Sequence, residues 1–250
     1  MNLTTILQYS TIDYRFLDIS LKQASKFSDK IIIPICDHFF DGEPENQKLL
    51  EKSFDIIKKY DKCEVYMFEW QGKKHTNIYY NVLSRLLGTS VANSSWLFYI
   101  DVDEIIDDSF GEWFETIKHT NNTYWLTCYW YFRESIYQST KNEGAGLLIR
   151  KEHCKWDINS SSDRQQLFYV PHFINGNNTP ILSKEGTPFV HHYSWVRTKE
   201  EMLKKVENWG HKHDKNWTSL IEEEFSRPFN GTDFVHGYSY NIVENKFNIK

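Results

Sequence analysis

The stretch Trp96-Leu97-Phe98-Tyr99-Ile100-Asp101-Val102-Asp103-Glu104 passes from an apolar run directly into a group of carboxylates. Such a run is typical of a strand buried on both faces of a parallel sheet. In an extended segment Asp101 and Asp103 point to the same side, because side chains alternate along a strand. Two carboxylates this close need positive charge beside them, and a hard divalent cation is the usual source. The alternative is that they only end the strand and cap the following turn.

The first hundred residues alternate between short apolar runs and helical patterns. We expect strands over 4–9, 30–36, 63–70 and 96–100, with helices after Ser10, from Pro44, and over 77–87, the last ending at Gly88. This βαβαβαβ order predicts a mainly parallel sheet with helices on both faces. Ligands of such sheets bind beyond the carboxyl ends of the strands, where Asp101 and Asp103 lie.

The second half of the chain is less regular. Ser109 and Glu112 have the spacing of a capping box and predict a helix there, and a second box at Thr198 predicts a helix that ends at Gly210. Strand-like runs over 123–133, 144–151 and 166–170 predict a mixed or antiparallel sheet. We therefore expect one α/β unit over 1–212, divided into a nucleotide-binding half (1–104) and an acceptor and metal half (105–212). Residues 213–250 are expected to pack on it as an extension.

Composition excludes several classes of protein. With 250 residues, of which 40% are hydrophobic, the chain can bury a large core and is not a disordered tail. A net charge of -5 argues against a general nucleic-acid binder. Neither a membrane-spanning run nor a secretory signal pattern is found, and the four cysteines form no C-x-x-C pair, so we expect a soluble cytoplasmic protein with reduced thiols.

A second polar motif, His191-His192-Tyr193-Ser194-Trp195-Val196-Arg197, follows about ninety residues after the acidic one. Neighbouring histidines in a strand face opposite sides, so at most one of them can join a metal site. A histidine pair alone is more often structural. Together with Asp101 and Asp103, however, one imidazole completes a reasonable manganese site.

Tyr99-Ile100-Asp101-Val102-Asp103-Glu104, followed later by His-Tyr-Ser-Trp-Val-Arg, resembles the nucleotide-sugar-dependent glycosyltransferases of the GT-A fold, close to family 2. The resemblance covers roughly residues 1–212 and implies a GT-A-like (Rossmann-like) three-layer α/β sandwich. It also implies that Mn²⁺ or Mg²⁺ bridges the diphosphate of the donor. Asp103 would be the direct metal ligand, Asp101 would contact ribose or a metal-bound water, and His192 would complete the shell. His191 remains the alternative to His192.

The same resemblance suggests residues that hold the nucleotide. Tyr9, Ser10 and Asp37 would hold the base, and Asp37 would accept a hydrogen bond from the imide N–H of uracil or thymine, which favours a UDP-sugar. The alternative for Asp37 is a turn residue. Asn81 and Arg85 lie one helical turn apart and would reach the nucleotide or the acidic pair, although Arg85 is equally well explained by a structural ion pair.

On the acceptor side, the resemblance implies a general base between the acidic pair and the late histidine. Asp163, within Ser160-Ser161-Ser162-Asp163-Arg164, is our candidate, with Asp157 and Glu143 in reserve; the alternative is a loop or cap residue. Aromatic rings pack against the apolar faces of sugars. The candidate rings for such contact come from one aromatic run and are Trp125, Trp130, Tyr131 and Phe132. Most of them are expected in the core.

These expectations describe a metal-dependent, inverting glycosyltransferase that acts on a glycan or another hydroxyl acceptor. One alternative is a phosphatase of the haloacid dehalogenase type, in which an Asp-x-Asp motif usually opens the domain and is followed by Gly and Thr. The other is a non-catalytic carbohydrate-binding protein with the same fold. Fold resemblance alone does not decide among these functions.

Overall fold

The computed structural model describes residues 2–117, 122–169, 177–208 and 214–249, which form a mixed α/β structure. Its helices and strands are, in chain order, β1 (Leu3–Gln8), the 3₁₀ helix η1 (Thr11–Phe16), α1 (Leu17–Phe27), β2 (Lys30–Cys36), α2 (Gln47–Ile57), β3 (Cys63–Phe68), α3 (Asn77–Val91), β4 (Trp96–Asp101), β5 (Glu104–Ile106), α4 (Ser109–Thr116), β6 (Thr123–Phe132), β7 (Glu134–Arg150), the 3₁₀ helix η2 (Lys151–His153), α5 (Gln166–Tyr169), β8 (Asn177–Ile181), β9 (Val190–Trp195), α6 (Lys199–Asn208), α7 (Trp217–Phe225) and β10 (Tyr240–Ile242). None of the helices within these residues is long and apolar enough to span a bilayer.

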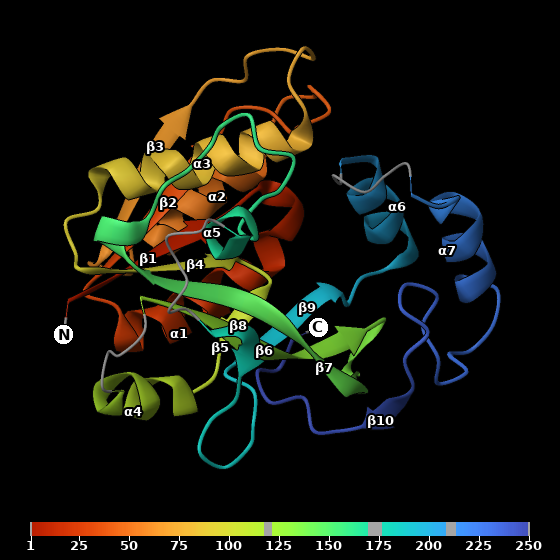
Figure 1. Cartoon of the computed structure of the whole chain (residues 1–250). Coiled ribbons are helices and arrows are strands. Elements are labelled where there is room, and N and C mark those ends of the chain that lie inside the picture. Colours follow the sequence, from red (N-terminus) through yellow and green to blue (C-terminus); the bar gives the residue numbers. More distant parts are fainter. Residues whose placement is uncertain (1, 118–121, 170–176, 209–213, 250) are drawn as a thin grey trace.

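The strands form one sheet in the order β3-β2-β1-β4-β7-β6-β9-β5, with β10 beside β7 and β8 beside β6 (Figure 1). Strands β1 to β4 pair in parallel, as expected from the first hundred residues. Beyond β4 the pairing is mixed, because β7 is antiparallel to both β4 and β6, whereas β9 is parallel to β6. The predicted α/β fold, with a parallel first half and a mixed second half, is confirmed.

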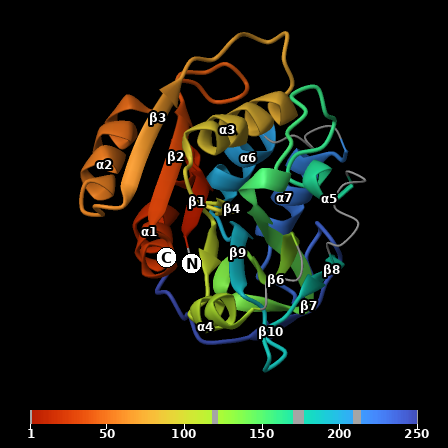
Figure 2. The same cartoon turned by 60° about the vertical axis from the view of Figure 1, so that its left-hand side comes forward.

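Helices cover both faces of the parallel half (Figure 2). On one face, Leu17 and Leu21 of α1 and Leu50 of α2 pack into a core with Leu3 and Phe98 from the strands. On the opposite face, which α3 covers, a smaller core contains the alternate strand residues, including Ile6, Ile32, Leu97 and Tyr99. A third cluster joins β6 and β9 to α6 and α7, so the C-terminal residues pack at the mixed end of the sheet.

The prediction that Gly88 ends the third helix is wrong. Helix α3 continues to Val91, and Gly88 lies inside it, against β1. A Cβ atom on Gly88 would lie 2.6 Å from Cγ2 of Ile6. This glycine therefore allows close contact between helix and strand instead of stopping the helix.

One predicted helix start and one predicted cap are also corrected. Helix α2 begins at Gln47 and not at Pro44, because the side chain of Asn46 caps it by accepting from the Leu49 N–H at 3.1 Å. Helix α4 is present and begins at Ser109 as predicted, but its N-cap residue is Asp108 and not Ser109, so Ser109 and Glu112 do not form the predicted capping box.

The remaining differences lie in the second half. The expected strand over 166–170 is the short helix α5 as far as Tyr169, and residue 170 lies outside the described residues. Strand β7 starts at Glu134, earlier than the predicted residue 144. The capping box at α6 is confirmed, since Thr198 N–H donates to Glu201 (2.8 Å) and Glu201 N–H donates to Thr198 Oγ1 (3.2 Å). The predicted end of this helix at Gly210 lies outside the described residues.

Candidate active site

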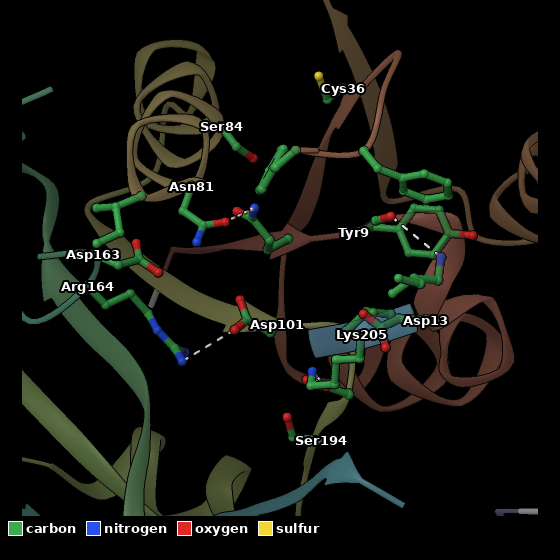
Figure 3. A pocket seen from close by; sticks show the side chains of 18 of the residues that line it. Tyr9, Asp13, Cys36, Asn81, Ser84, Asp101, Asp163, Arg164, Ser194 and Lys205 are labelled. Atoms are coloured by element: carbon green, nitrogen blue, oxygen red, sulfur yellow. Dashed lines mark hydrogen bonds and ion pairs between the residues drawn. The ribbon is translucent and has the colours of Figure 1, made fainter. Parts of the chain in front are cut away.

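A cavity of 490 Å³ lies at the carboxyl ends of β1, β2 and β4 (Figure 3). Its wall includes Gln8 from the end of β1, Cys36 from the end of β2 and Asp101 from the end of β4. The loop over 161–165 and helix α6 contribute the other sides. This is the position at which ligands of parallel α/β sheets bind, as the sequence predicted.

The cavity has two chemically different ends. One is apolar and aromatic, with Pro34, Phe39, Phe40, Phe68 and Ile78. The other is charged and contains Asp13, Asp101, Asp103, Asp163, Arg164, His192 and Lys205. In Figure 3, Asp163 and Arg164 lie on one side of Asp101, and Asp13 and Lys205 lie on the other.

Asp101 is held between two arginines. Its Oδ1 accepts from Nη2 of Arg85 at 2.8 Å, and its Oδ2 lies 3.5 Å from Nη2 of Arg164. Burial alone would raise the pKa of the Asp101 carboxyl, but the two guanidinium groups hold this pKa well below its usual range. Asp101 is therefore an ionised carboxylate with a cation beside each oxygen.

Glu104 fixes the turn that carries the acidic pair. It is fully buried, forms a two-point ion pair with Arg164 (2.7 Å for each N–O distance), and accepts the backbone N–H of Asp101 at 2.9 Å. We did not expect this role from the sequence. The available signal was the acidic residue directly after Asp103 and the arginine directly after Asp163.

Asp103 is buried, and its two carboxylate oxygens face different groups. Oδ1 lies 3.7 Å from Nε2 of His192, whereas Oδ2 lies 3.6 Å from Nη2 of Arg197 and 3.7 Å from Nζ of Lys205. Burial raises the pKa of Asp103, and the nearby carboxylate of Asp13 raises it further. The carboxylate is thus close to several cations without a tight hydrogen bond to any of them.

The pair of Asp103 and His192 fits a divalent cation that also binds substrate. Their facing atoms are 3.7 Å apart, so one Mg²⁺ or Mn²⁺ ion with bonds of about 2.1 Å can contact both. Among the described residues no group of three or more His, Cys, Asp or Glu side chains is arranged to hold a metal. Magnesium commonly takes its remaining ligands from water and substrate phosphates. Each oxygen of Asp101 already faces an arginine, so Asp101 does not fit as a direct metal ligand.

His191 faces away from the cavity, as strand alternation predicted. Its Nδ1 lies 2.8 Å from Oη of Tyr131, and its Nε2 lies 2.9 Å from Oδ2 of Asp107, which also pairs with Lys246. Burial lowers the pKa of His191. His191 therefore joins a buried polar network behind β9, and only His192 of the two histidines lines the cavity among the described residues.

Asp163 lines the cavity, where Arg85 binds both of its oxygens at 2.7 and 3.0 Å. The reserve candidates Asp157 and Glu143 are not among the described residues that line it. Glu143 instead lies 3.4 Å from His236 of the C-terminal segment. Of the three candidate bases, the structure brings only Asp163 to the charged end.

Tyr9 and Ser10 both line the cavity. Oη of Tyr9 is hydrogen-bonded to Ser53, and Oγ of Ser10 donates to Glu45 at 2.6 Å. Glu45 also lines the cavity, and burial raises its pKa. Glu45 is thus a buried carboxylate of the site that sequence reasoning missed.

Asn81 lines the cavity, whereas Asp37 is not among its described lining residues. Asn81 Oδ1 accepts from Nε2 of Gln8 at 3.0 Å, and the buried Oε1 of Gln8 has no hydrogen-bond partner within the described part of the chain. Asp37 Oδ1 accepts the Trp70 N–H at 2.8 Å. The side chain of Asp37 thus links the end of β2 to the segment after β3, and this contact does not support base recognition by Asp37.

Two cations of the site were also missed. Arg197 is buried and forms an ion pair with Asp13. Lys205 is largely buried at the cavity, and burial, together with nearby Arg197, lowers its pKa. The sequence signal for Lys205 was its position between the apolar residues Met202 and Val206 of α6, at the margin of the inward stripe.

Of the four aromatic residues expected near sugar, Trp130 lines the cavity. Tyr131 and Phe132 belong to the core, and Trp125 packs against the core cluster beneath α3. The ring of Trp130 contacts His192 edge to face, with centroids 4.9 Å apart. A single ring of that run is therefore placed to contact a sugar.

Comparison with solved structures finds similar chains of very low sequence identity. S. aureus TarS (residues 1–349) shares 12% identity with a TM-score of 0.49, covering 91% of this chain and 73% of that one. The glycosyltransferase GlyE of Streptococcus pneumoniae TIGR4 shares 11%, with a TM-score of 0.42 and coverages of 90% and 64%. The inositol-1-phosphate CTP transferase of T. maritima shares 10%, with a TM-score of 0.45 and coverages of 88% and 96%. No protein-family model and no curated protein matches the sequence.

Proposed function

We propose that this chain is a glycosyltransferase that moves a sugar from a nucleoside diphosphate to a hydroxyl group of a glycan or another acceptor. The observation that carries the proposal is the cavity, which joins an aromatic end to a charged end at the carboxyl ends of β1, β2 and β4. A nucleotide sugar has the same division, with a flat base at one end and a diphosphate in the middle. Pockets of this kind use apolar walls for affinity and a few polar groups for orientation.

The aromatic end is proposed to hold the nucleoside. Phe39, Phe40 and Phe68 offer apolar surface to a base. Oε1 of Gln8 and the carboxylate of Glu45 are acceptors for a base N–H, and the Gln8 oxygen has no partner in the described part of the chain. We propose a uridine diphosphate sugar as the donor, because uracil presents an imide N–H to such acceptors.

The charged end is proposed to hold the diphosphate together with a divalent cation. Asp103 and His192 would hold Mn²⁺ or Mg²⁺, which when bound neutralises charge on the phosphates. Asp101, fixed by Arg85 and Arg164, is an acceptor for a ribose hydroxyl. The metal dependence of the enzyme is part of this proposal.

The proposed reaction is a single displacement. An acceptor oxygen attacks the anomeric carbon, the bond from this carbon to the diphosphate oxygen breaks, and its electron pair leaves with the diphosphate. Asp163 takes the proton of the acceptor hydroxyl, because it is the one of the three candidate bases that lines the cavity; one of its oxygens must exchange Arg85 for the acceptor to do so. Attack opposite the leaving group inverts the anomeric centre, as in family 2.

The charge arrangement favours this function over the two alternatives. A phosphatase of the haloacid dehalogenase type needs an aspartate free to attack phosphorus, whereas both oxygens of Asp101 face guanidinium groups. A pocket for neutral carbohydrate has little use for a wall in which basic side chains lie beside the two carboxylates Asp101 and Asp103. Cationic side chains of this kind suit phosphate.

The test is a panel of nucleotide sugars incubated with the protein and Mn²⁺, with release of free nucleoside diphosphate and thermal stability both measured. A ligand at 100 times its Kd should stabilise the fold by about 2.7 kcal/mol. Release with at least one donor, abolished by Asp103→Asn, supports the transferase. Stabilisation without release indicates a binding protein, and phosphate release from simple phosphomonoesters indicates a phosphatase.

A further inference from the structure

Lys205 occupies an unusual position for a lysine. Helix α6 is amphipathic, with Met202 and Val206 buried and Lys204 exposed. The side chain of Lys205 is only 14% exposed and forms part of the cavity wall. Lysines are rarely buried unless the ammonium group has an anionic partner.

The ammonium group of Lys205 lacks a close partner. Its nearest carboxylate oxygen is Oδ2 of Asp103 at 3.7 Å, beyond hydrogen-bond distance. No hydrogen bond from Nζ is found in the residues that the structure describes. Since an ammonium group has three donors, Lys205 presents unused donors at the charged end of the cavity.

The arginines of the site are different in this respect, because each already has a carboxylate within hydrogen-bond distance. The pairs are Arg85 with Asp163, Arg164 with Glu104, and Arg197 with Asp13. Their guanidinium groups therefore already donate hydrogen bonds to carboxylates of the protein itself. Arg85 keeps one nitrogen without a hydrogen-bond partner, Nη1, but Arg85 is not among the described residues that line the cavity. Of the two cavity-lining cations in this set, Arg164 and Lys205, only Lys205 has no hydrogen bond to a carboxylate in the described part of the chain.

We infer that Lys205 binds the diphosphate of the nucleotide-sugar donor. This inference rests on the proposed function and adds a residue to it. Oδ1 of Asp103 faces His192 while Oδ2 faces Lys205, so the ammonium group and the proposed cation lie beside different oxygens of one carboxylate. In this position the side chain of Lys205 donates hydrogen bonds to phosphate oxygens, which become more negative as the bond to the sugar breaks.

The test compares a nucleoside diphosphate with its nucleoside. UDP, dTDP, CDP, GDP and ADP are first titrated into the wild type by calorimetry at saturating Mn²⁺. The best ligand and its nucleoside are then titrated into Lys205→Met and into Lys199→Met, a control on the same helix that is not among the described lining residues. Lys205→Met should weaken the diphosphate roughly 10- to 100-fold and leave the nucleoside unchanged. Lys199→Met should match the wild type.

The other outcomes separate the inference from the proposed function. Equal weakening of nucleoside and diphosphate in Lys205→Met, or no weakening of either, would overturn the inference and leave the transferase standing. Failure of the wild type to bind any of the five diphosphates would overturn both. Thermal melting checks the fold, and Lys205→Gln replaces Lys205→Met if the latter does not fold. Lys205→Arg, which keeps the charge, should retain most of the diphosphate affinity.

Discussion

Arg85 and Asp163 lie 78 residues apart in the sequence and form a two-point ion pair, with N–O distances of 2.7 and 3.0 Å. Arg85 comes from α3 in the first half of the chain, and Asp163 comes from the loop that borders the cavity. The same guanidinium group binds Asp101 at the end of β4. One buried arginine thus connects the helix, the strand end and the loop that together form the charged end of the site.

Replacing Arg85 with methionine should destabilise the fold by about 3 kcal/mol, because it leaves two carboxylates beside each other without their shared buried partner. Chemical denaturation measures this change. Arg227→Met is the control, since Arg227 is exposed and its pair with Glu223 (3.4 Å) should contribute less than about 0.5 kcal/mol. Equal stability of the two variants would show that the Arg85 cluster does not hold the site together.

Asp163→Asn should lower kcat by about 10² to 10⁴-fold while donor affinity stays nearly the same, because a general base acts on the acceptor. Both quantities must be measured, together with thermal stability, since the ion pair with Arg85 is weakened too. Asp157→Asn and Glu143→Gln serve as controls and should retain wild-type turnover. If Asp163→Asn stays within a few-fold of wild type, the anomeric configuration of the product shows whether the reaction needs a base there at all.

His192→Ala should weaken Mn²⁺ binding at least about tenfold in the presence of nucleoside diphosphate, because it removes one of two protein ligands. His191→Ala should leave this affinity intact and instead lower the free energy of unfolding by about 1 to 3 kcal/mol, since Tyr131 and Asp107 lose a buried partner. Manganese titration followed by electron paramagnetic resonance distinguishes the two. Metal loss in His191→Ala alone would contradict the assignment.

Asp107 should make stability sensitive to acid. Burial opposes its ionisation, but His191, Lys246 and the Ser109 N–H hold the pKa of Asp107 well below its usual range. A carboxyl with a lowered folded-state pKa adds stability above its unfolded pKa of about 3.9, and this stability is lost as the pH falls further. Asp107→Asn should therefore cost about 2 kcal/mol near neutral pH and progressively less in acid. Denaturation curves across this pH range would show a constant gap if the interpretation is wrong.

Gly88→Ala distinguishes a packing role from a helix stop. Alanine raises helix propensity by about 1 kcal/mol, so a gain in stability is expected if only the helix matters. The structure predicts a net loss, because the new Cβ would lie 2.6 Å from Ile6 Cγ2. The double variant Ile6→Ala and Gly88→Ala should lose less than the sum of the two single changes, which a double-mutant cycle measures.

Much of the fold was accessible from the sequence alone. The β-branched run over 30–36 and the apolar run before Asp101 identified two buried strands, and the Thr198–Glu201 capping box identified the start of α6. These features are encoded by residues next to each other or one helical turn apart. For the same reason, strand alternation was enough to separate the orientations of His191 and His192.

Only the tertiary structure decided how the charged groups are matched. Asp101 is held by arginines from α3 and from the loop after η2, and Arg197 meets Asp13, which lies 184 residues away in the sequence. No local pattern encodes such pairs, because sheet pairing and the packing of α3 and α6 bring the partners together. Long-range packing also places Gly88 against Ile6 of β1 and Asp37 beside the backbone of Trp70. The sequence thus determined the helices and strands and the acidic end of the strand. The partner of each carboxylate depends on long-range packing. For this reason only the tertiary structure shows which cationic side chain is available to a ligand.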